Sequence, residues 1–117
     1  MGKFSREKGK RGERMWAAVC RSHGFADARR GVQYSGREGQ ADDVTGLPGI
    51  HQEVKFVERL NLRDAMEQSA RDAAAAGRGD LPIVAHKQSG KEWLVTMRAD
   101  DWFRLFKAYH FAPTFKD

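Results

Sequence analysis

The sequence predicts an α/β fold with the element order α-β-β-β-α-β-β-α. Helical periodicity near both ends of the chain, short apolar segments of strand character, and an alanine-rich helix between two of them predict this class. A helix that joins two strands of one sheet makes a right-handed crossover, so these strands should be parallel within a mixed sheet. With 117 residues there is room for a single domain, 1–117, with one modest core.

The first half of this order begins with a helix from about Ser5 to His23, after a basic arm of about residues 1–5. Apolar residues recur along it at helical spacing, namely Met15, Trp16, Val19 and Cys20. Gly24 is a typical stop signal. Extended segments are expected at residues 28–34, 42–44 and 49–57. The turn residues from Gly46 to Gly49 should pair the last two of these as strands.

The second half begins at Asn61, which can cap a helix that ends at Gly77. One face of that helix is apolar, with Leu62, Ala65, Met66, Ala70 and Ala73. Strands are expected at residues 82–86 and 93–97. A last helix should start at Asp100 or Asp101 and pack one face inward. That face consists of Trp102, Leu105, Phe106 and Tyr109, and a short tail of about 111–117 follows.

The charge of the chain favours a polyanionic partner. Lysine and arginine number 21 against 16 acidic residues, which gives a net charge of +5. The basic residues are clustered at Lys3, Arg6, Lys8, Lys10, Arg11 and Arg14, and again at Arg29, Arg30 and Arg37. The alternative is a solvated basic face without a partner. The clusters flank an acidic group of residues, which favours the first interpretation.

Other features indicate a cytoplasmic protein. The single Cys20 allows no internal disulfide, as expected in a reducing compartment, and it should be a small core residue. No apolar run is long enough for a membrane span. The basic N-terminus has no hydrophobic segment behind it, so it does not resemble a secretory signal.

Two carboxylates and a lysine are expected to meet on the central hairpin. In the strand around Glu53 and Lys55, alternation places both side chains on one face, with His51 beside them. The turn that precedes this strand brings Asp43 back against Glu53. Paired carboxylates form a hard oxygen site that suits Mg²⁺, and a neighbouring lysine can orient a water. These groups are the parts of a metal-assisted phosphodiester hydrolase.

This pattern resembles the PD-(D/E)XK nuclease superfamily, and within it the archaeal-type Holliday junction resolvases and their phage-encoded relatives. The ordered set that carries the resemblance is Glu13, Ser35-Gly36, Asp43 and Glu53-Val54-Lys55. It covers roughly residues 6–109. Where the family has Pro-Asp or Gly-Asp, this chain has Asp42-Asp43. The family's aspartate precedes an apolar β-former, so Asp43 matches it better than Asp42.

The resemblance implies a central mixed sheet flanked by helices, a restriction-endonuclease-like nuclease core. It implies metal binding by Asp43, Glu53, the backbone carbonyl of Val54 and, through water or a second ion, Glu13. The implied cofactor is Mg²⁺, for which Mn²⁺ would substitute. Lys55 would orient the attacking water and stabilise the transition state, and Ser35 would lie near the scissile phosphate.

Each of these residues has an ordinary alternative. Asp43, Glu53 and Lys55 could be turn and strand-surface charges, and Ser35 a solvated loop residue. Glu13 could be a helix-surface charge whose nearest partner is Lys10. His51 is more often a strand-surface residue than a phosphate ligand. The basic residues expected to contact DNA phosphates are Lys8, Arg11, Arg29, Arg30, Arg37, Arg59, Arg63 and Lys87.

The expected function is a Mg²⁺-dependent endodeoxyribonuclease that resolves four-way DNA junctions as a homodimer, encoded by a phage or prophage and active in the bacterial cytoplasm. More aromatic residues lie near the C-terminus than a small fold can bury, Phe103 among them, and two symmetric cuts suit a two-fold dimer. One alternative is a nuclease of the same fold with a nicking, restriction-like or repair substrate. Another is a non-catalytic DNA-binding protein.

Overall fold

A computed structural model describes residues 3–31 and 42–113, and the side chains from residue 6 onward. Its elements are α1 (Lys3–Ser22), β1 (Arg29–Arg30), β2 (Val44–Thr45), β3 (Ile50–Phe56), α2 (Leu62–Ala76), β4 (Leu81–Lys87), β5 (Leu94–Met97) and α3 (Ala99–His110). The predicted order is confirmed. Element boundaries differ from the predicted ones by one or two residues, except that β1 is short within the described part of its segment.

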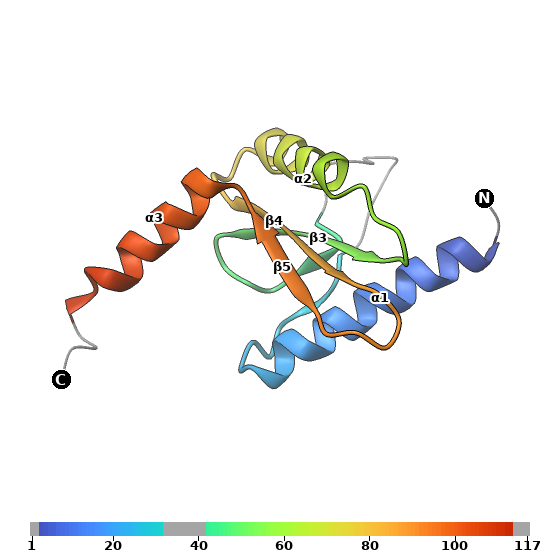
Figure 1. Cartoon of the computed structure of the whole chain (residues 1–117). Coiled ribbons are helices and arrows are strands. Elements are labelled where there is room, and N and C mark those ends of the chain that lie inside the picture. The colour runs from blue at the N-terminus through green and yellow to red at the C-terminus, as the bar shows by residue number, and fades with distance from the viewer. Residues whose placement is uncertain (1–2, 32–41, 114–117) are drawn as a thin grey trace.

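The five strands form one mixed sheet in the order β1-β2-β3-β4-β5 (Figure 1). β3 and β4 are parallel and joined through α2, whereas the other neighbours are antiparallel. α1 lies against β1, β2 and β3, and α2 lies against β3 and β4. Figure 1 shows these two helices on opposite faces of the sheet. The predicted fold class, a mixed sheet flanked by helices, is confirmed, and β3 lies at its centre.

α1 covers the sheet with its predicted apolar stripe. Trp16, Ala17 and Cys20 are buried in the core cluster, which also contains Val44, Val54 and Ala85 from the sheet. Near Gly12 the helix lies so close to β3 that a Cβ on Gly12 would be 2.5 Å from the Cβ of Phe56. Glycine is therefore required for this approach, which brings the next residue, Glu13, over the sheet.

α2 begins and ends where the sequence indicates. The side chain of Asn61 accepts a hydrogen bond from the backbone N–H of Asp64, and Gly77 closes the helix with a φ of 72°. Small residues on the inward face let the helix approach the sheet closely. Among them, Ser69 is fully buried and donates a 2.9 Å hydrogen bond to the carbonyl of Ile83.

α3 contradicts the predicted inward packing of its apolar stripe. The helix projects away from the sheet (Figure 1), and Asp101 is its one buried residue. All four stripe residues are exposed, from Phe106 at 43% to Tyr109 at 78%. The stripe residues contact one another instead, since the rings of Trp102 and Phe106 stack at 5.3 Å. Of the described C-terminal aromatic residues, Trp93 is the one that joins the core, beside Trp16 at 5.1 Å.

Candidate active site

Asp43 and Glu53 meet at the junction of β2 and β3. Register pairs Val44 with Gln52, so Asp43 lies opposite Glu53, just before β2 begins. Asp43 Oδ2 accepts a 2.9 Å hydrogen bond from the backbone N–H of Val54. The carboxyl group of Asp43 is also within hydrogen-bonding reach of that of Glu53. The turn and the strand alternation thus bring the two acids together as the sequence predicted.

Burial disfavours the charged form of both carboxyl groups. Burial, followed by the charges of Glu53 and Glu13, raises the pKa of Asp43 to about 8. Burial also raises the pKa of Glu53, although the nearby Lys55 opposes this shift. The ammonium of Lys55 lies 3.5 Å from Glu53 Oε2, so one cation accompanies at least two acids.

This surplus of negative charge fits a divalent cation. Asp43 and Glu53 supply hard oxygen atoms of the kind that Mg²⁺ prefers. The N–H and C=O groups of one strand residue point to the same edge. Because the N–H of Val54 points to Asp43, its carbonyl faces that side too. The donor set of two carboxylates and one carbonyl therefore suits the metal that the resemblance implies.

Glu13 reaches this region from α1. Its carboxylate accepts a 2.9 Å hydrogen bond from Arg30 Nε of β1. The alternative partner, Lys10, instead lies 3.9 Å from Glu7. Glu13 and Asp43 line a hollow of about 400 Å³ together with the cations Arg6, Lys10 and Arg30. Acidic side chains, which can bind a cation, and basic side chains, which can bind an anionic substrate, thus share one concave surface.

Asp42 has a structural role. It is buried, and it accepts hydrogen bonds from the backbone N–H of Gln52 at 3.0 Å and from Arg78 at 3.1 Å. His51 Nδ1 also lies 3.0 Å from Asp42 Oδ1. Burial would raise the pKa of Asp42, but the contacts with His51, Gln52 and Arg78 lower it. Because Asp42 is already fully engaged, Asp43 remains the stronger candidate ligand.

Sequence reasoning missed Asp72 of α2. A ring nitrogen of His51 and carboxylate oxygens of Glu53 and Asp72 all lie within 4.8 Å of one another. A signal existed in the sequence, because Asp72 follows the buried Ser69 by three residues and so shares the inward side of α2. His51 is fully buried and faces this acidic group, so the expectation of a strand-surface histidine is wrong.

The basic residues predicted to contact DNA have different surroundings. Lys8 lies 3.1 Å from Glu58 and above the ring of Phe56, over which Arg11 also lies. Arg30 is engaged by Glu13. The remaining described arginines of the set are exposed, namely Arg29, Arg59 and Arg63. Ser35 and Arg37 lie outside the described residues.

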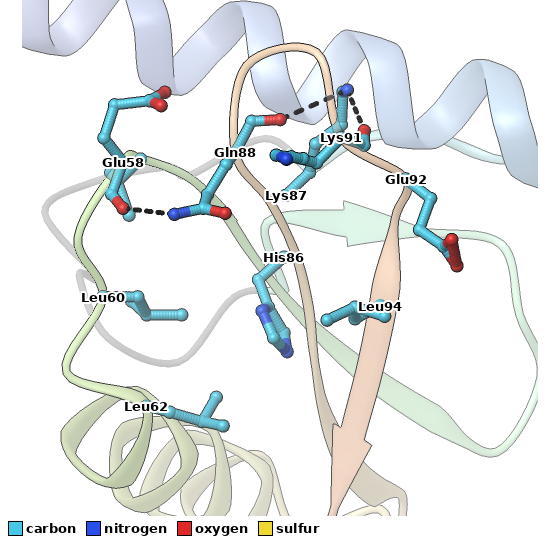
Figure 2. Close-up of a pocket in the computed structure, with 10 residues that line it drawn as sticks. Glu58, Leu60, Leu62, His86, Lys87, Gln88, Lys91, Glu92 and Leu94 are labelled. Atoms are coloured by element: carbon cyan, nitrogen blue, oxygen red, sulfur yellow. Dashed lines mark hydrogen bonds between the residues drawn. The ribbon is translucent and has the colours of Figure 1, made fainter.

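A second hollow, of about 690 Å³, lies between β4, β5 and the segment that follows β3 (Figure 2). Register places His86 next to Lys55, and His86 Nε2 is 2.9 Å from Thr96 Oγ1. Burial lowers the pKa of His86. At the rim, Gln88 donates a 2.7 Å hydrogen bond to the carbonyl of Glu58. The residues that line this hollow include Leu60, Leu62, His86, Lys87 and Leu94. It flanks the acidic cluster and does not contain it.

The sheet, its covering helices and the carboxylate pair define a chain with the fold of the PD-(D/E)XK nuclease superfamily. Comparison with solved structures confirms the more specific resemblance as well. Archaeoglobus fulgidus Hjc, a Holliday junction resolvase from an archaeal hyperthermophile, matches with a TM-score of 0.56 and 26% sequence identity. The match covers 74% of each chain. The chain thus resembles the archaeal-type Holliday junction resolvases.

Two other comparisons add nothing to this match: no protein-family model and no curated protein matches the sequence. Within the described part of the chain, every helix is too short or too polar to cross a bilayer.

Proposed function

We propose that this protein is a metal-dependent endonuclease that cuts four-way DNA junctions. The observation that carries the proposal is the pairing of Asp43 with Glu53 beside Lys55, in a fold that resembles a Holliday junction resolvase. The net charge of +5 supports a nucleic-acid substrate. Basic side chains around Glu13 and Asp43 would position the phosphate backbone without reading base sequence.

Each residue of the site has a separate role in this proposal. Asp43, Glu53 and the carbonyl of Val54 hold the cation, and Glu13 completes the site through water. When bound, Mg²⁺ lowers the pKa of a water and neutralises charge on the phosphate. Lys55 stays beside Glu53, where its ammonium orients the attacking water and stabilises negative charge in the transition state. Ser35 approaches the scissile phosphate.

The active protein in this proposal is a homodimer. A four-way junction requires two cuts related by approximate two-fold symmetry, which two copies of one chain provide. α3 offers the apolar surface for this contact, because its aromatic residues do not pack on the described core. Exposed contiguous apolar surface of this kind marks interfaces in otherwise polar proteins.

Cleavage of a labelled four-way junction and of a matched linear duplex tests the proposal, with Mg²⁺ or with EDTA. We expect Mg²⁺-dependent cuts on opposite strands of the junction and little cleavage of the duplex. Equal cleavage of both substrates would favour a nuclease of the same fold with another substrate. Binding without cleavage under any divalent ion would favour a non-catalytic DNA-binding protein.

A further inference from the structure

The side of β3 that faces α2 holds a second group of candidate ligands, which shares Glu53 with the Asp43–Glu53 pair. His51, Glu53 and Asp72 each offer one ligand atom, and these atoms lie within 4.8 Å of one another. His51 and Glu53 are buried, with exposures of 0% and 3%. Asp72 is half-buried, so the group has a side open to solvent. An ion can therefore enter without unfolding of the sheet.

The histidine is arranged as metal-binding histidines are. Its Nδ1 lies 3.0 Å from Asp42 Oδ1, and Asp42 is itself held by Arg78 and by the N–H of Gln52. A carboxylate on one ring nitrogen fixes the tautomer and leaves the lone pair of the other nitrogen free for a cation. Nε2 is buried and, like Nδ1, makes no hydrogen bond of good geometry among residues 6–31 and 42–113. A buried polar atom without a partner is costly, and a bound ion would remove this cost.

The acids of the group also lack sufficient counter-charge. Lys55 accompanies Glu53 at 3.5 Å. Within the described chain, no hydrogen bond or ion pair engages Asp72, which interacts with His51 and Glu53 through its charge. Asp42 is paired with Arg78, so among the described residues Lys55 is left as the cation for the carboxylates of Glu53 and Asp72 when His51 is neutral. A divalent cation would balance this charge.

We propose that His51, Glu53 and Asp72 form a second cation site, selective for a divalent transition-metal ion such as Mn²⁺ or Zn²⁺. Imidazole nitrogen suits these ions, whereas Mg²⁺ prefers an all-oxygen shell. The inference rests on the proposed function in one respect: Glu53 is shared. A carboxylate has two oxygens, so Glu53 can bind an ion on each side. An ion bound by His51 would then hold the Glu53 carboxylate in the orientation in which it binds the catalytic ion.

Nitrogen coordination is the readout that distinguishes this site from the catalytic one. The catalytic set contains oxygen ligands alone, so an ion bound there shows no coupling to histidine nitrogen. The full chain, saturated with Mn²⁺ and freed of excess ion, should show ¹⁴N modulation in its electron spin echo signal. This modulation should persist when Mg²⁺ is added in excess. A wild-type signal without nitrogen coupling would overturn the proposal and leave His51 as a buried counter-charge.

Substitutions identify which histidine supplies the coupled nitrogen. His51→Asn should lose the ¹⁴N coupling, whereas His86→Asn, in a histidine that contacts Thr96 instead, should retain it. Because His51 is fully buried, Asp72→Asn on the half-exposed side of α2 provides a second test if His51→Asn does not fold. It should weaken Mn²⁺ binding by at least about tenfold, the effect expected for loss of a ligand. Unchanged Mn²⁺ affinity in Asp72→Asn would count against the site.

The test of this cation site can succeed or fail independently of the test of the proposed nuclease function. Nitrogen coupling without junction cleavage would support this cation site and refute the proposed enzyme activity. Cleavage with oxygen-only coordination of Mn²⁺ would do the opposite.

Discussion

The centre of the sheet and the C-terminal helix depart from normal burial in opposite ways. At β3, Glu53 is 3% exposed and shares the nearby Lys55 with Asp43, although carboxylates are seldom buried in pairs. On α3, Tyr109 is 78% exposed and Phe103 is 53% exposed, although aromatic residues are usually covered. The proposed cation would neutralise the buried acids, and the proposed dimer contact would cover the exposed aromatic rings. The two regions thus call for different kinds of partner under the proposed function.

Removing one acid from the sheet should have the largest effect on activity. We expect Asp43→Asn or Glu53→Gln to reduce junction cleavage on the order of 10³-fold, because the cation loses a ligand and the transition state loses its charge stabilisation. Junction binding should remain or become tighter, since less negative charge faces the phosphates. Gel-shift and cleavage assays measure the two effects separately.

The matched control for this change is Glu67→Gln, which removes an exposed acid from α2 outside the site. It should cut normally. Substantial Mg²⁺-dependent cleavage by both Asp43→Asn and Glu53→Gln would refute the assignment of the site.

A charge on the aromatic face of α3 should separate the subunits without unfolding them. Phe106→Glu alters a ring that stacks on Trp102 and has no contact with the described core. Loss of a central aromatic contact costs about 2 kcal/mol or more, which weakens the dimer about thirtyfold. Phe103→Glu should act similarly, because both sides of the helix are exposed. Light scattering at micromolar concentration measures the mass.

Arg104→Glu, an exposed charge reversal on the same helix, is the control and should remain a dimer. The Phe106→Glu monomer should nick junctions while losing paired cuts. A wild-type mass of one chain would refute the dimer, whatever the variants do.

A smaller effect is expected from removal of two basic residues, Arg29 and Arg37. Replacing Arg29 and Arg37 with alanine should lower the slope of log affinity against log salt by about two, since each phosphate contact contributes about 0.9. Arg30 is left in place because it pairs with Glu13. Arg71→Ala, an exposed change on α2, is the control. An unchanged slope in the double variant would show that these two arginines do not contact the DNA.

At the centre of the sheet and at α3 alike, the sequence predicted some features and missed others. The meeting of Asp43 and Glu53 was predictable because strand alternation and a short turn are local and leave little choice of geometry. The approach of Asp72 was not predicted, since it depends on the rotation of α2 over the sheet. That rotation is set by small residues such as Ser69, which sequence patterns weigh poorly.

α3 shows what periodicity alone can and cannot indicate. The stripe that contains Trp102 and Phe106 correctly predicted an amphipathic helix. It did not identify what covers the stripe, because a helix packs equally well on its own domain or on another chain. The prediction of inward packing assumed that the helix packs on its own domain, but the structure shows these rings exposed. A similar limit applies to Glu13, whose nearest partner is Arg30 of another element and not the local Lys10.

The smallest predicted effect concerns stability without metal and follows from the pKa of about 8 for Asp43, against 3.8 in an unfolded chain. Between these values the folded protein binds a proton that the unfolded chain releases. The free energy of unfolding in EDTA should therefore fall as pH rises from about 4 to 8. Asp43→Asn removes this titration and should raise the melting temperature at pH 8 by several degrees, since about 1 kcal/mol corresponds to roughly 4 °C. Thermal unfolding of the wild type and of Asp43→Asn at pH 5 and pH 8 measures the pH dependence and the effect of the substitution. An equal pH dependence in the two proteins would show that Asp43 and Glu53 do not destabilise the fold by charge repulsion.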